Sequence, residues 1–188
     1  MSVKQKRWLW VLVLVTTVVA VDLISKQSVS HNLALGETRE PVELFAPYFQ
    51  ITLSYNTGAA FGMLPDAGNI FLIVAVVIVI GMLFFYNRIP DNGTMTRVGI
   101  GLIVGGALGN AIDRIQHGHV IDFIHYSLPQ LNLSNVSNLA DHAIVLGVIL
   151  VLIDSWRLER LEKEADTADS PSATPNISGE TGDGENIV

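Results

Sequence analysis

The chain has 188 residues, of which 49% are hydrophobic and only 15% are charged, and its mean hydropathy is +0.43. Soluble domains carry about 25% charged residues, so this composition indicates a membrane protein. The formal net charge of −7 arises near the end of the chain, because residues 159–188 hold eight acidic and two basic residues. Nucleic-acid binding therefore has no support, and the absence of cysteine excludes disulfides, cysteine-ligated metals and thiol nucleophiles.

Four apolar segments predict four transmembrane helices, over about residues 8–26, 69–87, 97–114 and 139–157. The first follows basic residues, as a signal peptide does, but no small-x-small cleavage site closes it, so we expect it to be retained. The strictly uncharged runs are all shorter than the roughly 20 residues that a spanning helix needs. The polar residues at those helix ends must therefore lie at membrane depth, where ionisable groups are functional candidates.

The basic residues predict the orientation of these helices. With the N-terminus inside, the cytoplasmic flanks hold eight Lys or Arg residues and the outer side holds three. Cytoplasmic flanks of membrane proteins carry an excess of Lys and Arg, so we expect both termini in the cytoplasm. This orientation places Asp22, Asn56, Asp113, Asp122 and Asp141 together on the outer side.

Residues 27–68, between the first two helices, predict an extracytoplasmic β segment. Phe49, Ile51, Leu53 and Tyr55 alternate with polar residues, which is typical of a half-buried strand. Residues 42–45 are a candidate partner strand, preceded by turn signals. The expected fold is a membrane all-α bundle of four transmembrane helices with a small extracytoplasmic β-sheet on the membrane surface. This membrane domain covers 1–158, and 159–188 form an acidic tail that we expect to be cytoplasmic and disordered.

Several polar residues have a structural explanation beside a functional one. Asp122 stands in the apolar pentad Val-Ile-Asp-Phe-Ile, where a lone carboxylate is penalised unless a partner such as Arg114 compensates it. Asn138 and Asp141 suit a helix start, with an N-cap and an acid in the first turn. Helical spacing also allows simple rim ion pairs: Asp22 with Lys26, and Asp113 with Arg114 on the face that carries Asn110.

Elimination among reaction types leaves acid–base chemistry by two carboxylates. His117, His119 and His125 lie near Asp113 and Asp122, but the His-Glu-x-x-His spacing is absent, and solvated loop histidines are the simpler explanation. No Gly-x-Ser-x-Gly motif is present either. Two neighbouring carboxylates cannot both ionise, so one holds a proton and the other activates water for attack on an amide. Amides such as Asn56 or Asn138 would stabilise the developing charge.

Two other classes of function remain open from the residues alone. A proton- or ion-coupled carrier also uses buried Asp, Asn and Arg, although the two halves of this chain show no repeat. A noncatalytic scaffold would use Gly101, Gly105 and Gly109, whose spacing of four lets a neighbouring helix approach closely.

Five motifs together resemble lipoprotein signal peptidase (signal peptidase II) over about residues 8–156. They are Asp22-Leu-Ile-Ser-Lys26, Asn56-Thr-Gly-Ala-Ala-Phe61, Gly109-Asn-Ala-Ile-Asp-Arg114, Val120-Ile-Asp-Phe123 and Asn138-Leu-Ala-Asp141. The resemblance implies a membrane aspartic endopeptidase with Asp122 and Asp141 as the catalytic pair. It implies substrate-binding or supporting roles for Asp22, Lys26, Asn56, Gly58, Asn110, Asp113, Arg114, Asn138 and Ala140. Ser137 departs from the family, which usually has Phe there.

The resemblance also implies the partners and the location. The substrates would be lipid-modified prolipoprotein signal peptides, cleaved before the diacylglyceryl-modified cysteine of the lipobox, and globomycin-type inhibitors are expected. We expect no cofactor and no metal, contact with membrane lipids, and a monomer. The location would be the bacterial cytoplasmic (inner) membrane, multi-pass, with the active site near the outer leaflet.

Overall fold

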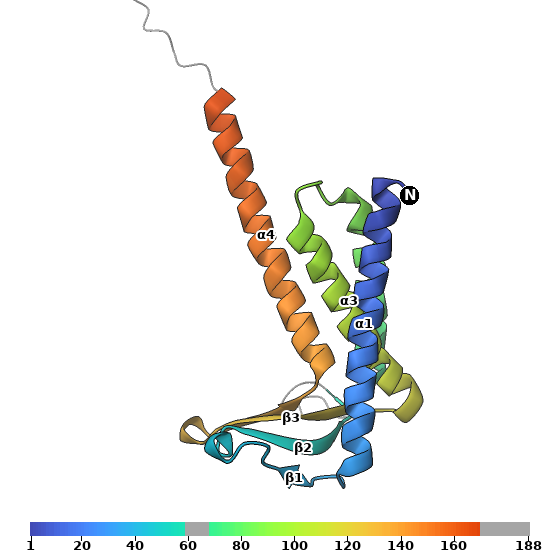
Figure 1. Ribbon diagram of the computed structural model, residues 1–188, viewed down its shortest axis with the longest axis vertical. Coiled ribbons are helices and arrows are strands. Elements are labelled where there is room, and N and C mark those ends of the chain that lie inside the picture. The colour runs from blue at the N-terminus through green and yellow to red at the C-terminus, as the bar shows by residue number, and fades with distance from the viewer. Residues whose placement is uncertain (59–67, 170–188) are drawn as a thin grey trace, which may run out of the picture.

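The computed structural model describes residues 1–58 and 68–169 and contains four long helices and a small sheet. The helices are α1 (Val3–Asn32), α2 (Gly68–Phe85), α3 (Thr94–His117) and α4 (Leu139–Asp169). All four are long and apolar enough to cross a membrane. The sheet lies across one end of the bundle, while the N-terminus and the far end of α4 lie at the other (Figure 1). The predicted fold class is confirmed.

Helix α3 is the centre of the bundle. In its most apolar window 67% of the residues are buried, against 11%, 6% and 17% in α1, α2 and α4. The glycines of α3 allow this burial. A Cβ added at Gly101, Gly105 or Gly109 would collide with Leu14, Val18 or Asp22 of α1, respectively. The other three helices leave broad apolar faces exposed, as a bundle surrounded by lipid requires.

A second row of glycines brings α3 against α4. A Cβ added to Gly99 would lie 2.6 Å from the carbonyl oxygen of Gly147, and one added to Gly106 would clash with the carbonyl of Ala140. Backbone atoms cannot move aside as flexible side chains do. The two helices therefore approach this closely only because both positions lack a side chain.

Alanine at these positions is expected to destabilise the bundle. We expect Gly99→Ala and Gly106→Ala each to cost about 1–3 kcal/mol through overpacking. Gly81→Ala is the matched control, because an added Cβ there meets nothing within 4 Å. Thermal unfolding in detergent would measure the difference. Equal melting temperatures for Gly106→Ala and Gly81→Ala would contradict this account of the packing.

The sheet is antiparallel, in the order β1-β2-β3-β4: Thr38–Arg39, Phe49–Asn56, Val120–Leu128 and Leu133–Ser137. The predicted strand over 49–55 is confirmed as β2. The partner predicted over 42–45 is wrong, because Glu43–Phe45 form a short 3-10 helix and Thr38–Arg39 pair with Ile51 and Thr52 instead. Pro41 and Pro47 flank this segment and have no backbone N–H to donate to a sheet, which disfavours a paired strand there.

Helices α1, α3 and α4 extend beyond their predicted bounds, whereas α2 ends at Phe85, before the predicted end at 87. Helix α1 begins at Val3, behind a capping box of Ser2 and Gln5, and continues past Lys26 to Asn32. Helix α4 continues past the predicted end at 157 to Asp169, so residues 159–169 of the expected disordered tail are helical. Strong helix formers and the Glu159–Lys163 pair at i, i+4 favour this extension. Residues 170–188 lie outside the described part.

At the end opposite the sheet, α4 caps the start of α3. The N-cap residue Gly93 offers no side chain, and Asp154 of α4, which is completely buried, accepts hydrogen bonds from the backbone N–H (2.9 Å) and hydroxyl (2.8 Å) of Thr96. The first N–H groups of a helix have no partner within it, so this carboxylate satisfies one of them from a neighbouring helix. Sequence reasoning did not single out Asp154.

Candidate active site

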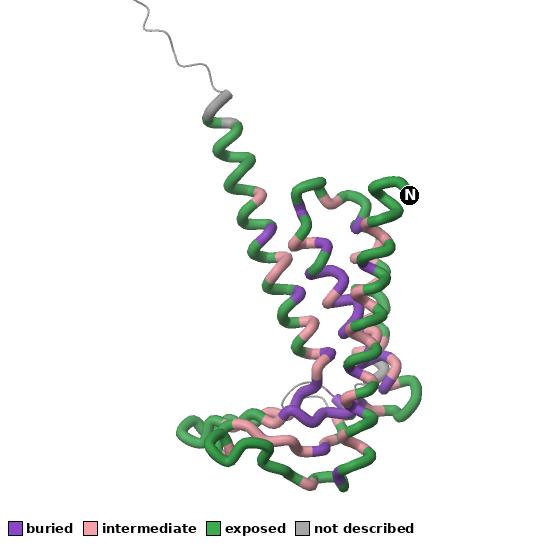
Figure 2. Tube along the Cα trace, in the orientation of Figure 1, coloured by how far each residue is buried: buried purple, intermediate pink, exposed green. Residues whose placement is uncertain are grey.

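The polar residues predicted for the site come together where α3 and α4 meet the sheet. Figure 2 shows buried residues gathered at the foot of α4 and along the adjoining strand. Three helices and two strands contribute: Asp22 and Lys26 (α1), Asn56 (β2), Asn110, Asp113 and Arg114 (α3), Asp122 (β3), and Ala140 and Asp141 (α4), with Asn138 directly before α4. Asp22, Lys26, Asp113, Asp122, Asn138 and Ala140 are at most 2% exposed.

Lys26 forms ion pairs with two buried carboxylates. Its Nζ lies 2.7 Å from Oδ2 of Asp22 and 2.9 Å from Oδ2 of Asp113, and it donates to Oδ1 of Asn110 at 3.0 Å. The ammonium group therefore makes two ion-pair contacts and one hydrogen bond, all within the buried cluster. Of the two ion pairs considered from the sequence, the one between Asp22 and Lys26 is present, and the one between Asp113 and Arg114 is wrong. Asp22 and Lys26 are buried, and Asp113 pairs with Lys26 instead of Arg114.

This buried cluster holds the backbone beside each of the two predicted catalytic aspartates. Oδ1 of Asp22 accepts the N–H of Ala140 at 2.9 Å, one residue before Asp141. Oδ2 of Asp113 accepts the N–H of Ile121 at 3.1 Å, one residue before Asp122. Charge-assisted hydrogen bonds of this kind are strong, so α1 and α3 together set the positions of both aspartates.

Amide side chains bind the two aspartates directly. Asp122 accepts from Asn138 Nδ2 at 2.6 Å on Oδ1 and from Asn56 Nδ2 at 2.9 Å on Oδ2. Oδ1 of Asp141 accepts from Asn110 Nδ2 at 2.7 Å, and its backbone N–H donates to Oδ1 of Asn138 at 2.9 Å. Asn138 therefore bridges both residues.

The bond from Lys26 decides which way Asn110 points. An ammonium group only donates, so it must face the amide oxygen of Asn110. The NH₂ group is then turned to Asp141. A residue of the first helix thus orients a donor to an aspartate of the fourth.

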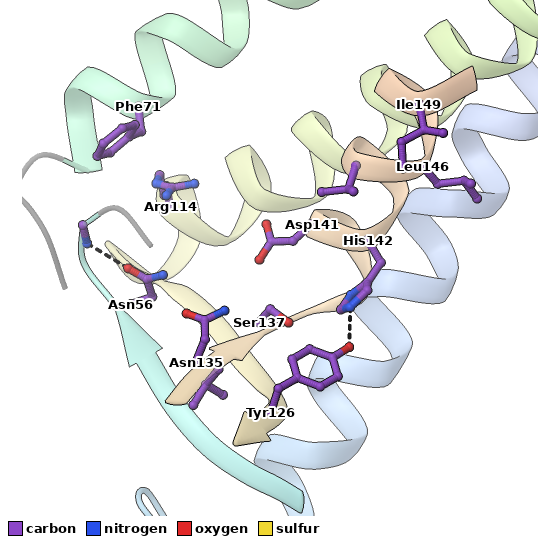
Figure 3. A pocket seen from close by; sticks show the side chains of 13 residues that line it. Asn56, Phe71, Arg114, Tyr126, Asn135, Ser137, Asp141, His142, Leu146 and Ile149 are labelled. Atoms are coloured by element: carbon purple, nitrogen blue, oxygen red, sulfur yellow. Dashed lines mark hydrogen bonds between the residues drawn. The ribbon is translucent and has the colours of Figure 1, made fainter. Parts of the chain in front are cut away.

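Asp141 and Arg114 line a cavity of about 770 Å³. Its apolar wall follows α4 along Val145, Leu146 and Ile149, and its polar end contains Asn56, Arg114 and Asp141 (Figure 3). Oδ2 of Asp141 accepts no hydrogen bond from the described residues, and this oxygen is therefore the one available to a bound water. Gly58 also lines the cavity and donates its N–H to Oδ1 of Asn56 at 3.0 Å, which fixes the direction of that amide.

Sequence reasoning missed Tyr126 and His142, which line the same cavity. The Tyr126 hydroxyl is hydrogen-bonded to Nε2 of His142, and Nδ1 of His142 donates to the carbonyl of Asn138 at 2.6 Å (Figure 3). This link ties β3, which carries Asp122, to the helix that carries Asp141. Tyr126 lies four residues after Asp122, and His142 directly follows Asp141. This closeness in sequence was the only signal that could have identified them.

Burial raises the pKa of Asp122 to about 6. Desolvation is the largest cause, and the nearby charge of Asp141 adds to it, while the hydrogen bonds from Asn56 and Asn138 oppose it. Burial disfavours the charged form of a carboxyl group, so Asp122 keeps its proton to a higher pH than an ordinary aspartate does. Perturbed carboxyl groups beside a cavity are candidates for acid–base chemistry.

The histidines considered as metal ligands lie apart. His117 ends α3 and His119 follows it, with their tilted rings 5.9 Å apart between centroids, whereas His125 lies in the sheet between Thr52 and Ser134. Within residues 1–58 and 68–169, no group of three or more His, Asp or Glu side chains is placed to hold a metal ion.

Residues 14–157 match the family model described as signal peptidase (SPase) II. The chain belongs to the signal peptidase II family. A lipoprotein signal peptidase of Shewanella woodyi is 41% identical over 155 residues, covering 79% of this chain and 82% of the relative. One from Pseudomonas syringae pv. tomato is 35% identical over 163 residues, covering 85% and 91%.

Solved structures of two bacterial membrane enzymes share this fold. One is 28% identical with a TM-score of 0.67, covering 87% of this chain and 94% of the enzyme. The other is 31% identical with a TM-score of 0.64, covering 76% and 90%. These likenesses confirm the signal peptidase II resemblance drawn from the five motifs. They also show that the chain is a multi-pass membrane protein.

Proposed function

We propose that the chain removes signal peptides from prolipoproteins as an aspartic endopeptidase, cleaving before the diacylglyceryl-modified cysteine of the lipobox. One observation carries the proposal: Asp122 and Asp141, far apart in sequence, are joined through Asn138 beside a cavity with an apolar wall. A lipobox and attached acyl chains are apolar, which suits Val145, Leu146 and Ile149. Asp22 and Asp113 would support these two residues through the backbone N–H groups beside them. Asn110 would do so through its bond to Asp141, and Lys26 through its bond to Asn110.

The two aspartates would divide the acid and base roles by their surroundings. Asp141, which faces the cavity, takes a proton from water as the water oxygen attacks the scissile carbonyl carbon. Asp122, the more buried, protonates the carbonyl oxygen. When the C–N bond breaks, the proton on Asp141 passes to the leaving nitrogen, and the collapsing hydroxyl returns a proton to Asp122. Arg114 and Asn56 lie where they would stabilise charge on the carbonyl oxygen.

The carrier alternative receives no support from the middle of the bundle. Between the site and the buried Asp154 at the other end, α3 buries Ile100, Ile103, Val104 and Ala107. A transport path needs polar groups or water across this depth. The buried polar groups near the sheet thus serve one side of the membrane.

The orientation proposed is the one that the basic residues predict, with both termini in the cytoplasm and the site at the outer leaflet of the bacterial cytoplasmic membrane. The N-terminus and the far end of α4 do lie on one side of the bundle, away from the sheet (Figure 1). We further propose that the protein acts as a monomer, because one chain supplies all the site residues.

The direct test is cleavage of a lipidated prolipoprotein by the purified protein. We expect release of the signal peptide only from the diacylglyceryl-modified substrate, inhibition by globomycin, and no loss of activity with a chelator. The unlipidated precursor is the matched control. Failure to cleave the lipidated substrate, or loss of activity with chelator that added metal restores, would overturn the proposal.

The pKa of Asp122 gives a signed pH dependence. If Asp122 must be protonated, kcat/KM should fall as the pH rises. The midpoint of this alkaline limb should lie near pH 6, with a decrease of about tenfold per pH unit above it. Asn56→Leu removes a hydrogen bond that favours the ionised form, so it should raise this pKa and move the limb to higher pH. The readout is the midpoint, which a lower overall rate does not change. A shift to lower pH would contradict the assignment of Asp122 as the acid.

A further inference from the structure

Two turns of the sheet meet at the end that is remote from α1, and we call residues 41–49 and 126–133 the sheet tip. Figure 1 shows these turns, drawn in cyan and ochre, projecting sideways past the foot of α4. They are held together, because the carbonyl of Tyr48 accepts the N–H of Ser127 at 3.0 Å, and Gln130 Nε2 donates to the Tyr48 hydroxyl at 3.1 Å. The rings of Phe49 and Tyr126 also lie 6.3 Å apart.

The sheet tip exposes large apolar side chains although it lies outside the four spanning helices. Leu44 is 79% exposed, Leu131 65% and Phe45 53%. Val42, Leu128 and Leu133 are each about half exposed. Glu43 is the one charged residue in these two ranges. A contiguous apolar surface of this kind marks an interaction site, because water disfavours it.

The position of the sheet tip selects lipid as its partner. The sheet lies at the end of the spanning helices, and the tip extends beyond α4, so it stands over the bilayer and not over the bundle (Figure 1). Helix α4 also exposes apolar side chains, with Val145, Val148 and Leu152 at 59%, 42% and 63%. The tip therefore projects past the foot of a helix whose exposed apolar side chains must face acyl chains.

We propose that the sheet tip is a second membrane anchor, which inserts Leu44, Phe45 and Leu131 at the boundary of headgroups and acyl chains in the leaflet on the sheet side. Apolar side chains on a surface element bind at this depth in proportion to the area they bury. The anchor holds the free end of the sheet down on the bilayer. This inference does not depend on the proposed peptidase activity.

Spin labels can test the anchor directly, because the chain has no cysteine of its own. The full-length variants Leu44→Cys and Leu131→Cys would be labelled and reconstituted in phosphatidylcholine vesicles. Power saturation should show each label more accessible to oxygen, which concentrates in lipid, than to a water-soluble nickel chelate. Thr38→Cys, on the exposed edge strand β1, is the control and should show the opposite preference.

Two outcomes would overturn the proposal. One is a label at Leu44 or Leu131 with the same nickel accessibility as the label at Thr38. The other is spin–spin broadening at Leu44 that disappears when labelled protein is diluted with unlabelled protein. That result would assign the surface to a second copy of the chain.

Discussion

Asp122→Asn and Asp141→Asn should each reduce prolipoprotein cleavage at least about 10³-fold while leaving the protein folded. General acid or base catalysis by a positioned side chain contributes about 10²–10⁴-fold, and an amide can neither give nor take the proton at these positions. Both substitutions preserve the shape of the side chain, so most of the surrounding hydrogen bonds can still form. The measurement is single-turnover cleavage of the lipidated substrate, with thermal unfolding as the check on folding.

Asp154→Asn is the matched control for these two variants. Asp154 is also completely buried in α4, but it caps α3 at the far end of the bundle. Its replacement should lower the melting temperature and leave the cleavage rate of the folded protein nearly unchanged. Parental cleavage rates in either Asp122→Asn or Asp141→Asn would rule out the catalytic pair.

Lys26→Met should be the most destabilising single change in the site. It leaves Asp22 and Asp113 buried with their cation removed, and losing one partner of a buried ion pair costs about 3–5 kcal/mol. The same change frees Asn110 to turn, so the donor to Asp141 is no longer fixed. We therefore expect a large fall in melting temperature, measured in detergent, together with a loss of cleavage.

Lys163→Met separates this effect from the general loss of a lysine. Lys163 pairs with Glu159 on the exposed surface, where an ion pair contributes about 0–1 kcal/mol. Replacing Asp22 and Asp113 by Asn in the Lys26→Met background should recover part of the lost stability, because no carboxylate then remains uncompensated. Equal melting temperatures for Lys26→Met and Lys163→Met would contradict the central role of Lys26.

Local pattern was sufficient for the helices and for strand β2. Long apolar runs predict spanning helices whatever their neighbours are, and the alternation from Phe49 to Tyr55 predicts a strand with one buried face. Strands β3 and β4 were not predicted. Residues 120–124 of β3 are all buried, so they lack the two-residue alternation that predicts a half-buried strand. Strand β4 is recognised only by its pairing with β3.

The identity of the polar residues followed from the sequence, since carboxylates and amides at membrane depth require a reason and five motifs matched one family. Their partners did not follow. Lys26 and Asn110 are 84 residues apart, and Asp22 and Ala140 are 118 apart. Such bonds depend on how closely α1, α3 and α4 pack, which the glycines permit but do not specify. Sequence alone therefore predicted which polar side chains gather at the site, and only tertiary packing decided which group each one binds, because hydrogen bonds act over about 3 Å and not along the chain.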